Sequence, residues 1–554
     1  MRLSRIQIEG YRAIRRLDLE LDDLTAVIGE NGFGRTSLLD ALMSCLGAGA
    51  GLPEFAPEDF HAPPPPELPA ERIRIELTFV ETRPGERAAV PALAPVTSGP
   101  DGAGLLLLRV EADRAATGPS PCLATFCAPD GRPLDPQPPA STLVALRERC
   151  PAVVLRAGRY FVGPTRAARA TPAPLEADPA LVGLEDQVLR AYARLAHGWD
   201  LTSPDMRAGI EAARTIVARV SERLAARARP RTTRLLEVLA QAPGARSQVA
   251  PGAPALGGAA QGLAALLLFG GLFHANGGAP DALGDADPIL VIEDPEANLH
   301  PVVAANVSRL IDALPVQRLV TTNSGDLLAS IPLWSLRRAV RGPDGVRVHQ
   351  VARRALSLDD LRRVGYHVRA NRADALFARC WLLVEGETEF WIVPELARVL
   401  GYDLPSEGVR VVEFAQCGVE PLVRLAQALG IAWHLLADGD EAGRRYAARA
   451  RELADPAAGG GVTLLEEHDV EHCFYAHGLD DIYLRASGIK PRPARGGGPP
   501  RGPAPWKVIA RAMDELGKPR LALEVIEAVA ERGVDAVPPP LRALIEVAVR
   551  LARG

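Results

Sequence analysis

Two short apolar runs in the C-terminal half of the chain each end abruptly in carboxylates and glycine. LLVEGETEF carries Glu385 and Glu389, and LLADGDEAG carries Asp438 and Asp440, with Asp438 following 53 residues after Glu385. Such runs are typical of buried strands of a parallel sheet, whose carboxyl ends share one edge where ligands bind. Four carboxylates at neighbouring strand ends repel one another unless divalent cations neutralise them. The two motifs therefore predict an α/β domain with a Mg²⁺ site for phosphoryl-transfer chemistry.

The order of these motifs, a strand ending in E-G-x-x-E and then a strand ending in D-x-D, resembles a Toprim domain. Toprim domains carry the chemistry of topoisomerases, bacterial primases and some nucleases. The alternative is a pair of acidic turns on an ordinary α/β domain. Because an apolar strand precedes both motifs, the Toprim interpretation is favoured.

Two further features extend this site. The segment TLLEEHDVEHCFY places Asp469 and Glu471 on one side of an extended segment, as a candidate third acidic element. Glu466 and Glu467, in contrast, are expected on the solvated surface. Only three of the 63 basic residues are lysine, so Lys518, beside a tight turn in LGKPRLALEV, is expected in the active site for its compact amine.

The N-terminal segment predicts a nucleotide site. Residues 2–28 are expected to form two strands joined by a turn, followed by GENGFGRTS and the helix LLDALMSCL. Strand, glycine-rich loop and helix are the context of a P-loop, whose backbone N–H groups cradle phosphates. The expected ATP contacts are Gly29, Asn31, Gly34, Arg35, Thr36 and Ser37, with Thr36 as a Mg²⁺ ligand.

A partner to this loop follows at residues 288–301, PILVIEDPEANLHP. The strand is expected to end at Glu293, which holds Mg²⁺ mostly through water, and Asp294, which positions an attacking water. RLVTTNSGDLL then predicts a buried strand leading to Asn323. These pieces resemble an ABC-type ATPase head of the SMC kind, with Walker B, D-loop and switch regions.

Two residues depart from that pattern. Arg35 stands where the P-loop has lysine, and a planar guanidinium is not equivalent to a point-charge ammonium. Asn323 replaces the switch histidine and cannot carry a proton. Nucleotide binding is therefore expected, while a slow, nucleotide-regulated head and a fast ATPase both remain open.

The separation of 258 residues between Arg35 and Glu293 implies an inserted lobe. Helical periodicity across its middle predicts either simple helical packing or an antiparallel arm that pairs two subunits. The expected domain order is a first part of the ATPase (1–174), a helical dimerisation insert (175–240), a second part of the ATPase (241–350), a Toprim domain with a Rossmann-like parallel sheet (375–490) and a helical basic region (491–554). The fold class is α/β.

Composition limits the partners. The formal net charge of −5 gives no overall basic field, so DNA contacts have to come from local patches. Residues 490–554 carry 12 basic and 7 acidic side chains, which suits either a DNA-backbone contact or a solvated helical cap. Seven scattered cysteines without CxxC spacing and the lack of a signal peptide predict a cytoplasmic protein with reduced thiols. The apolar segment 256–273 contains five glycines and is expected to be a buried helix, with no membrane contact.

An ATPase head followed by a Toprim domain resembles the OLD (overcoming lysogenisation defect) family of nucleases over essentially the whole chain. The most specific marks are LVEGETEFWIVPELARVLG, LLADGDEAG, EHDVEHCF, GKPRLALEV and GENGFGRTSLLDAL. The resemblance implies DNA cleavage with two divalent ions, Mg²⁺ or Mn²⁺, together with ATP and Mg²⁺ in the head. It also implies a link to phage defence or DNA repair, in some members beside a UvrD-like helicase.

Carried over by position, the resemblance makes Glu385 a general acid/base or outer ligand, and Lys518 a stabiliser of the pentacovalent phosphate. The residues that would hold the metals are Glu389, Asp438, Asp440, Asp469 and Glu471. The expected function is an ATP-binding, metal-dependent DNA endonuclease, dimeric through the helical arm. Three alternatives stay open: a DNA-binding ATPase with an inactive Toprim domain, a Toprim RNA-processing nuclease, and a topoisomerase-like or primase-like enzyme. The last lacks a recognisable second domain with a catalytic tyrosine.

Overall fold

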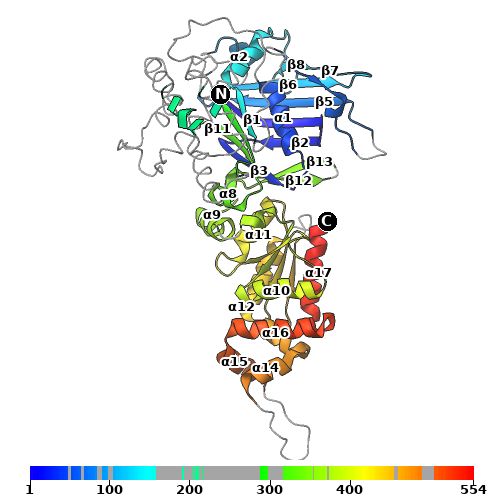
Figure 1. Cartoon of the computed structure of the whole chain (residues 1–554), viewed down its shortest axis with the longest axis vertical. Coiled ribbons are helices and arrows are strands. Elements are labelled where there is room, and N and C mark those ends of the chain that lie inside the picture. The colour runs from blue at the N-terminus through cyan, green and yellow to red at the C-terminus, as the bar shows by residue number, and fades with distance from the viewer. Residues whose placement is uncertain are drawn as a thin grey trace, which may run out of the picture. The chain divides into compact units, whose positions relative to one another are not determined.

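The computed structural model divides the chain into two compact units, residues 1–349 and residues 350–554, shown in Figure 1. The described residues are 1–30, 32–47, 51–63, 68–83, 86, 90–97, 104–156, 287–296, 316–342, 344–353, 355–370, 373–454, 460–489 and 504–554, with isolated positions between 187 and 215. Asn31, nearly all of the predicted insert 175–240 and the apolar segment 256–273 lie outside them. Both units are mixed α/β, which confirms the predicted fold class.

In the described part of the first unit, one eleven-stranded sheet has the order β8-β6-β5-β1-β2-β13-β12-β3-β11-β10-β9. The bounds are β1 Arg2–Tyr11, β2 Ile14–Glu20, β3 Leu24–Gly29, β5 Arg72–Val80, β6 Leu105–Asp113, β8 Leu123–Cys127, β9 Ala152–Arg156, β10 Ile289–Glu293, β11 Gln317–Thr321, β12 Leu336–Gly342 and β13 Gly345–Gln350. Helices α1 (Arg35–Leu46), α2 (Ser141–Arg149) and α8 (Gly325–Ser330) accompany it, and β4 (Glu54–Phe55) pairs separately with β7 (Ser120–Pro121).

The antiparallel half of this sheet follows the alternation of the sequence. On β5 every second side chain, from Ile73 to Phe79, is fully buried, which matches the alternation of apolar residues in RIRIELTFV. The prediction of two strands in residues 2–28 was wrong, because the segment forms three. The break falls at Asp22, whose N–H donates to Thr25 Oγ1 at 2.9 Å, a local side-chain bond that competes with the ladder.

The parallel half carries the nucleotide motifs. β3 pairs in parallel with β11 and β12, and β10 lies between β11 and β9. The strands β3 and β10 are apolar nearly throughout, as expected where both faces of a sheet are covered. Since β3, β11 and β10 are parallel, their carboxyl ends meet at one edge, and α1 starts there.

The second unit contains a four-stranded parallel sheet with the order β15-β14-β16-β17. Its strands are β14 Cys380–Val384, β15 Val409–Glu413, β16 Ala432–Ala437 and β17 Gly460–Leu464. The chain passes from β14 to β15 on one side and returns to β16 on the other, so a topological switch point lies between β14 and β16. The register pairs Leu383 with Leu435, so the two acidic motifs follow adjacent strand ends at the place where such sheets bind ligands.

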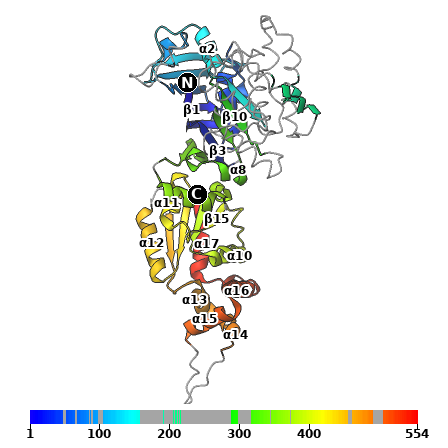
Figure 2. The same ribbon diagram turned by 90° about the vertical axis from the view of Figure 1, so that its left-hand side faces the viewer.

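Helices cover both faces of this sheet (Figure 2). α10 and α17 contact each other on one side, and α11 and α12 contact each other on the other. The bounds are α9 Leu358–Val364, α10 Glu387–Val399, α11 Val419–Ala428, α12 Glu441–Leu453, α13 Val470–Phe474, α14 Asp480–Ser487, α15 Pro505–Leu516, α16 Lys518–Arg532 and α17 Pro539–Arg553. Apolar residues of α15, α16 and α17 belong to the same core cluster as Leu382 of β14, so residues 504–554 are part of this unit's core.

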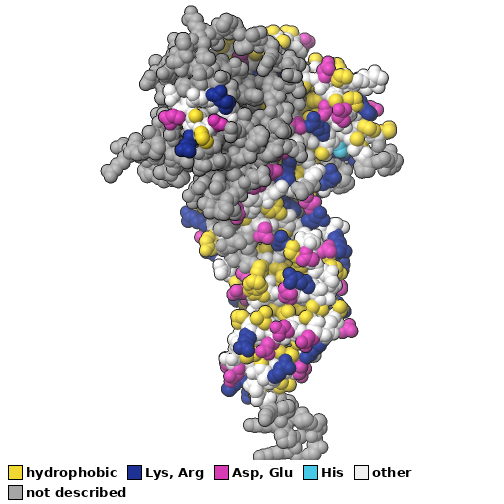
Figure 3. Space-filling view, in the orientation of Figure 1, with side chains coloured by type: hydrophobic (Ala, Val, Ile, Leu, Met, Phe, Trp, Pro, Cys, Tyr) yellow, Lys and Arg dark blue, Asp and Glu magenta, His cyan; other side chains and the backbone are white. Residues whose placement is uncertain are grey.

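Two predictions about the whole chain can be compared with this structure. All seven cysteines are free, as predicted. None of the helices within the described ranges combines the length and apolar composition needed to cross a membrane. On the face of the second unit seen in Figure 3, acidic and basic side chains are interspersed.

Candidate functional site

The first acidic motif turns directly from strand β14 into helix α10. Glu389 lies in the first turn of α10 and is buried, and its Oε2 accepts a hydrogen bond from the N–H of Gly386 at 3.0 Å. Glu385 occupies the position immediately after the strand. Its Oε2 is buried and has no hydrogen-bond partner within the described structure, an expensive arrangement for a carboxylate that nothing neutralises.

The second acidic motif repeats this geometry after strand β16. Asp440 caps α12, with Oδ1 accepting from the N–H of Gly443 at 2.6 Å. Gly443 lies so close to the strand end that a Cβ there would collide with the carbonyl oxygen of Asp438. Glycine is therefore required for helix α12 to start against the acidic residues.

The third acidic element has a different local structure from the one predicted. Asp469 and Glu471 do not share an extended segment: Asp469 caps the short helix α13, and Glu471 lies buried in its first turn. Asp469 Oδ1 accepts from the N–H of His472 at 2.8 Å and is 2.6 Å from His472 Nδ1. The sequence did contain the signal, because aspartate is among the strongest N-cap residues.

Lys518 lies beside this element. Its Nζ is 3.0 Å from Glu471 Oε1. The side chain leaves the first residue of α16, after Gly517 in the left-handed region at φ 77°. Burial lowers the pKa of Lys518, but the Glu471, Glu389 and Asp469 carboxylates together outweigh it, so the net pKa is raised and the amine stays protonated.

The carboxylates of the three elements affect one another. Burial, followed by Glu389, Glu385, Asp469 and Glu471, raises the pKa of Asp438 to about 8. Burial, Asp440 and Glu389 likewise raise the pKa of Glu385. Although burial acts to raise it, the pKa of Asp469 is lowered by the hydrogen bonds from His472. Four of the predicted carboxylates therefore lie within electrostatic range of Asp438, and Asp440 lies within range of Glu385.

Three of the predicted metal ligands are oriented by a hydrogen bond at the N-terminus of a helix. One carboxylate oxygen of each residue accepts a hydrogen bond from a backbone N–H at a helix N-terminus: Glu389 at α10, Asp440 at α12 and Asp469 at α13. This bond fixes the orientation of each carboxylate, and the second oxygen of Asp469 lies 3.4 Å from Nδ1 of His468. The positive end of each helix dipole also stabilises the negative charge gathered there.

The donor set fits hard divalent cations. Carboxylate oxygens are the ligands that Mg²⁺ and Mn²⁺ prefer, and the buried, unpartnered Oε2 of Glu385 together with the raised pKa of Asp438 indicates negative charge that a cation would neutralise. Among the described residues, the groups of three donors whose atoms all lie within 4.8 Å are Glu467–Cys473–His477 and His468–Asp469–His472. Asp469 is the one predicted ligand that belongs to either group.

Glu466 is exposed, as predicted, but the same expectation for Glu467 was wrong. The Glu467 side chain is 19% exposed, and its Oε1 lies 3.7 Å from Nδ1 of His477. Its backbone carbonyl accepts from the N–H of Gly439 at 3.0 Å. This bond ties the α13 segment to the turn that holds Asp438 and Asp440.

Two glycines of the loop between β3 and α1, Gly29 and Gly34, occupy positions that a larger residue would not fit. Gly34, at φ 98°, immediately precedes α1, and a Cβ there would lie 2.7 Å from Ile14 Cγ1. Gly29, at the end of β3, is closed in by Phe33 and the carbonyl of Ala339. Ser37 is buried in α1, where its Oγ accepts from the N–H of Ala13 at 3.4 Å, so its observed contact is structural.

Two pairs connect this loop to the end of β10. Thr36 Oγ1 donates to Glu293 Oε1 at 2.9 Å, which places the predicted Mg²⁺-binding hydroxyl and carboxylate side by side. Arg35 forms an ion pair with Asp294 at 3.1 Å. Asp294 has a left-handed backbone at φ 44°, a strained conformation that is concentrated at functional sites. Burial raises the pKa of Asp294, with Arg35 acting in the opposite direction.

Asn323 is exposed near the same edge, and its backbone N–H donates to Glu296 Oε1 at 3.0 Å. Thr322 Oγ1 donates to the same oxygen at 2.7 Å. Glu296 was missed in the sequence, although it lies three residues after Glu293 in IEDPE. It connects the β10 and β11 ends, and its other oxygen is buried without a hydrogen-bond partner in the described structure.

The fold and the two sites define a class of protein: an ATPase-head-like unit with a phosphate loop, followed by a Toprim-like parallel sheet with a carboxylate cluster. The chain belongs to the family described as "Protein of unknown function (DUF2813)", whose model matches residues 1–375. Residues 376–440 match the Toprim domain of proteins like the overcoming lysogenization defect protein. The second match confirms the resemblance to the OLD family.

A curated relative has the same extent as this chain. The uncharacterized protein YbjD of Escherichia coli (strain K12) is 36% identical over 579 residues, covering 100% of both proteins. Among solved structures, the SMC head domain from Thermotoga maritima matches at 16% identity and TM-score 0.31, covering 64% of this chain and 100% of that one. The C-terminal region of the Burkholderia pseudomallei OLD protein matches at 19% identity and TM-score 0.25, covering 31% of this chain and 98% of that one.

Proposed function

We propose that this protein is an ATP-binding, divalent-metal-dependent DNA endonuclease whose chemistry takes place at the carboxylate cluster of the second unit. One observation carries the proposal: β14 and β16 are neighbours, the α13 segment is bonded to the turn after β16, and where these three acidic elements meet, burial and four neighbouring carboxylates raise the pKa of Asp438 to about 8. A high concentration of negative charge is unfavourable unless a bound cation neutralises it, and carboxylates perturbed in this way at a topological switch point are typical of functional sites.

The roles follow from position. Glu389, Asp438, Asp440, Asp469 and Glu471 would hold two ions, Mg²⁺ or Mn²⁺. Bound there, the cations would activate the attacking water and neutralise the leaving oxygen. Glu385, buried and unpartnered at Oε2, would act as general acid/base or outer ligand. Lys518, held protonated beside Glu471, would stabilise charge on the pentacovalent phosphate.

The first unit would bind ATP with Mg²⁺ and regulate cleavage. Arriving nucleotide has to exchange the Arg35–Asp294 pair for a contact between Arg35 and phosphate. Thr36 and Glu293, already 2.9 Å apart, would hold the head's Mg²⁺ between them. Asn323 and Asp294 would then face the γ-phosphate, with Asp294 positioning the attacking water.

Cleavage of supercoiled plasmid with Mg²⁺, Mn²⁺ or EDTA tests the nuclease. Wild type should nick and linearise the plasmid only with metal, while Glu385→Ala and Asp438→Ala should lose cleavage and keep nucleotide binding. Glu395→Ala is the matched control, because Glu395 lies on α10 but pairs with Arg398 at the surface. Cleavage that survives both active-site changes would refute the assignment, and cutting of RNA in place of DNA would replace it with the RNA-processing alternative.

The wider setting proposed here rests on the family resemblance: a cytoplasmic homodimer, paired through the helical insert at 175–240, acting in phage defence or DNA repair and in some genomes beside a UvrD-like helicase. In this proposal the ATPase head comprises residues 1–174 and 241–350, the Toprim domain residues 375–490, and the basic region residues 491–554. Light scattering of the full chain, with and without residues 175–240, tests the dimer. A dimer that persists without the insert would exclude that route.

A further inference from the structure

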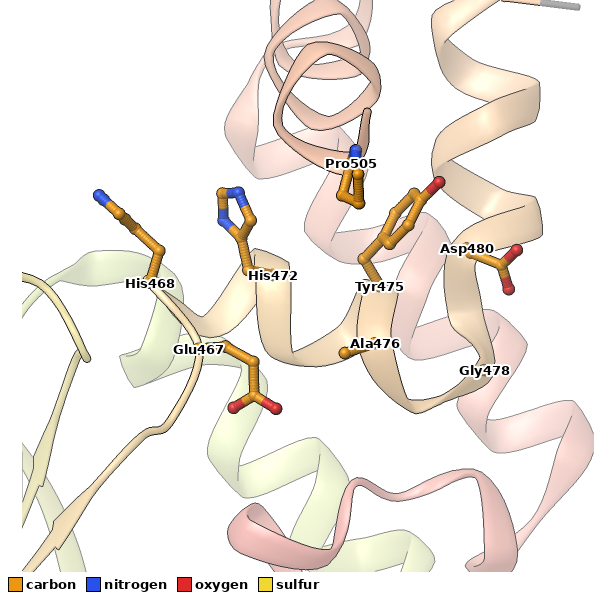
Figure 4. Close-up of a pocket in the computed structure, with 8 residues that line it drawn as sticks. All are labelled: Glu467, His468, His472, Tyr475, Ala476, Gly478, Asp480 and Pro505. Carbon is orange, nitrogen blue, oxygen red and sulfur yellow. The ribbon is translucent and has the colours of Figure 1, made fainter. Parts of the chain in front are cut away.

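An open cleft of about 540 Å³ lies against helix α13 in the second unit. It is lined by Glu467, His468, His472, Tyr475, Ala476, Gly478, Asp480 and Pro505. Figure 4 shows three rings projecting to one side, those of His468 just before α13, His472 within α13 and Tyr475 just after it, whereas the Glu467 carboxylate points to the opposite side. Neither the sequence motifs nor the proposed cleavage chemistry assigns a role to these rings.

The cleft shares a wall with the carboxylate cluster. His468 and His472 flank Asp469 in the chain, and His472 Nδ1 is 2.6 Å from Asp469 Oδ1. The carbonyl of Glu467 is bonded to the N–H of Gly439, between Asp438 and Asp440. A group bound in the cleft would therefore lie beside Asp469 and near the turn that carries Asp438 and Asp440, three of the residues expected to hold the metals.

The lining offers stacking surfaces held in place. The rings of His468 and His472 have centroids 5.4 Å apart and are tilted by 42°. Tyr475 packs edge-on against buried Tyr483, with centroids 5.9 Å apart, which fixes its ring. Aromatic and imidazole faces of this kind are what proteins use to hold unpaired bases.

The charge of the side chains that line the cleft favours a base over a phosphate as its occupant. None of the eight lining residues is lysine or arginine, and Asp480 adds a carboxylate, so the cleft disfavours phosphate. A carboxylate accepts hydrogen bonds from the amino groups of bases. Lys507 follows the lining residue Pro505 by two positions in the chain, and its Nζ is 5.2 Å from the ring centre of Trp506.

We propose that this cleft binds one unpaired DNA base next to the phosphate that is cut, so that the enzyme acts on DNA with an unpaired nucleotide at the cleavage position. The inference rests on the proposed nuclease function and specifies its substrate. The cleft volume is within the range of small-ligand pockets and leaves room for a base. The rings select for an unpaired base because a base within a duplex cannot leave its stack without an energetic cost.

The test uses the full-length protein and a branched DNA with a short single-stranded flap. The cleavage position is first mapped with wild type and Mg²⁺ or Mn²⁺, and an abasic nucleotide is then placed on either side of it. Tyr475→Leu removes the ring and keeps apolar volume, and His468→Ala removes an exposed ring. Tyr402→Leu is the matched control, since Tyr402 packs on the same hydrophobic core and is not among the residues that line the cleft.

For wild type and Tyr402→Leu, the abasic nucleotide should raise KM or Kd at least about five-fold, the scale of losing one stacked base. For Tyr475→Leu the intact flap should already bind that weakly, and the abasic nucleotide should add little further loss. If wild type cuts but base removal has no effect, or Tyr475→Leu behaves as Tyr402→Leu, the cleft proposal is overturned and the nuclease stands. If wild type cuts no DNA, both proposals fail.

Discussion

Lys518 Nζ lies 3.0 Å from Glu471 Oε1 although 47 residues separate them in the chain. The carboxylate is buried, while the lysine side chain is 48% exposed. The pair joins the start of α16 to the first turn of α13, and it brings a protonated amine to the edge of the carboxylate cluster. In a chain with only three lysines, this contact places one of them beside the carboxylates that the proposed cleavage mechanism uses.

Lys518→Met should abolish DNA cleavage, and it should also lower the free energy of unfolding by about 1 kcal/mol, because Glu471 stays buried without its partner. Adding Glu471→Gln to Lys518→Met should restore stability but not cleavage. Plasmid cleavage and urea denaturation measure the two effects. Full cleavage by Lys518→Met would exclude a catalytic role for the amine.

Asp438→Asn should make the metal-free protein more stable while removing cleavage. With a folded pKa of about 8 against an ordinary value near 3.8, wild type takes up protons on folding, so its stability falls as pH rises from about 4 to about 8. Asparagine has no such dependence. The free energy of unfolding of the variant in EDTA should therefore exceed that of wild type by about 1 kcal/mol or more at pH 8, after allowance for solvent screening. Near pH 4 the two values should be equal.

Thermal unfolding in EDTA at pH 4, 6 and 8 checks this prediction. Added Mg²⁺ should raise the Tm of wild type more than that of Asp438→Asn, since binding to the folded state stabilises it. Equal Tm values for the two proteins at all three pH values would show that the carboxylates do not repel one another.

His434 should make the second unit sensitive to acid. Burial lowers its pKa to about 4 from 6.5, so the folded protein keeps the ring neutral while the unfolded chain takes up a proton. The stability that the neutral ring contributes is fully present above pH 6.5. As pH falls toward 4, the free energy of unfolding decreases by about 2 to 3 kcal/mol. His434→Gln retains a donor for Thr463 Oγ1, 2.9 Å from the ring, and should flatten the slope of stability between pH 6.5 and 4.

Asp294→Asn should tighten ATP binding several-fold and slow its hydrolysis. The substitution weakens the ion pair with Arg35, worth about 1 kcal/mol for a partly exposed pair, and it removes the carboxylate expected to position water. Arg35→Ala should weaken binding about tenfold or more. Titration with a fluorescent ATP analogue and Mg²⁺ measures both, and weaker binding by Asp294→Asn would mean that this carboxylate itself contacts the nucleotide.

Gly443→Ala should disrupt the carboxylate cluster although it changes no ligand. The added Cβ would collide with the carbonyl of Asp438, so α12 cannot start where it does and Asp440 loses its position. Cleavage should fall at least tenfold, with stability lowered by about 2 kcal/mol. Gly365→Ala is the control, because a Cβ there meets nothing within 4 Å, and it should be neutral or slightly stabilising.

Several site residues could be predicted from the sequence because local chemistry marks them. The acidic motifs follow apolar strands, and the loop GENGFGRTS follows β3 and precedes α1, as the pattern requires. The residues that were missed or misplaced depend on contacts that no local pattern shows. Glu296 joins two strand ends through Thr322 and Asn323, and Glu467 turns inward toward His477.

The sequence alone therefore determined the α/β class, the two acidic strand ends, the phosphate loop and its partner carboxylates, since each is carried by contiguous residues with a fixed periodicity. Only the tertiary structure decided which of these groups meet. Strand order placed β14 beside β16, the caps of α10, α12 and α13 oriented three carboxylates, and the packing of α16 brought Lys518 to Glu471. The physical reason is that local propensity acts through near neighbours in the chain, whereas burial and charge act through space.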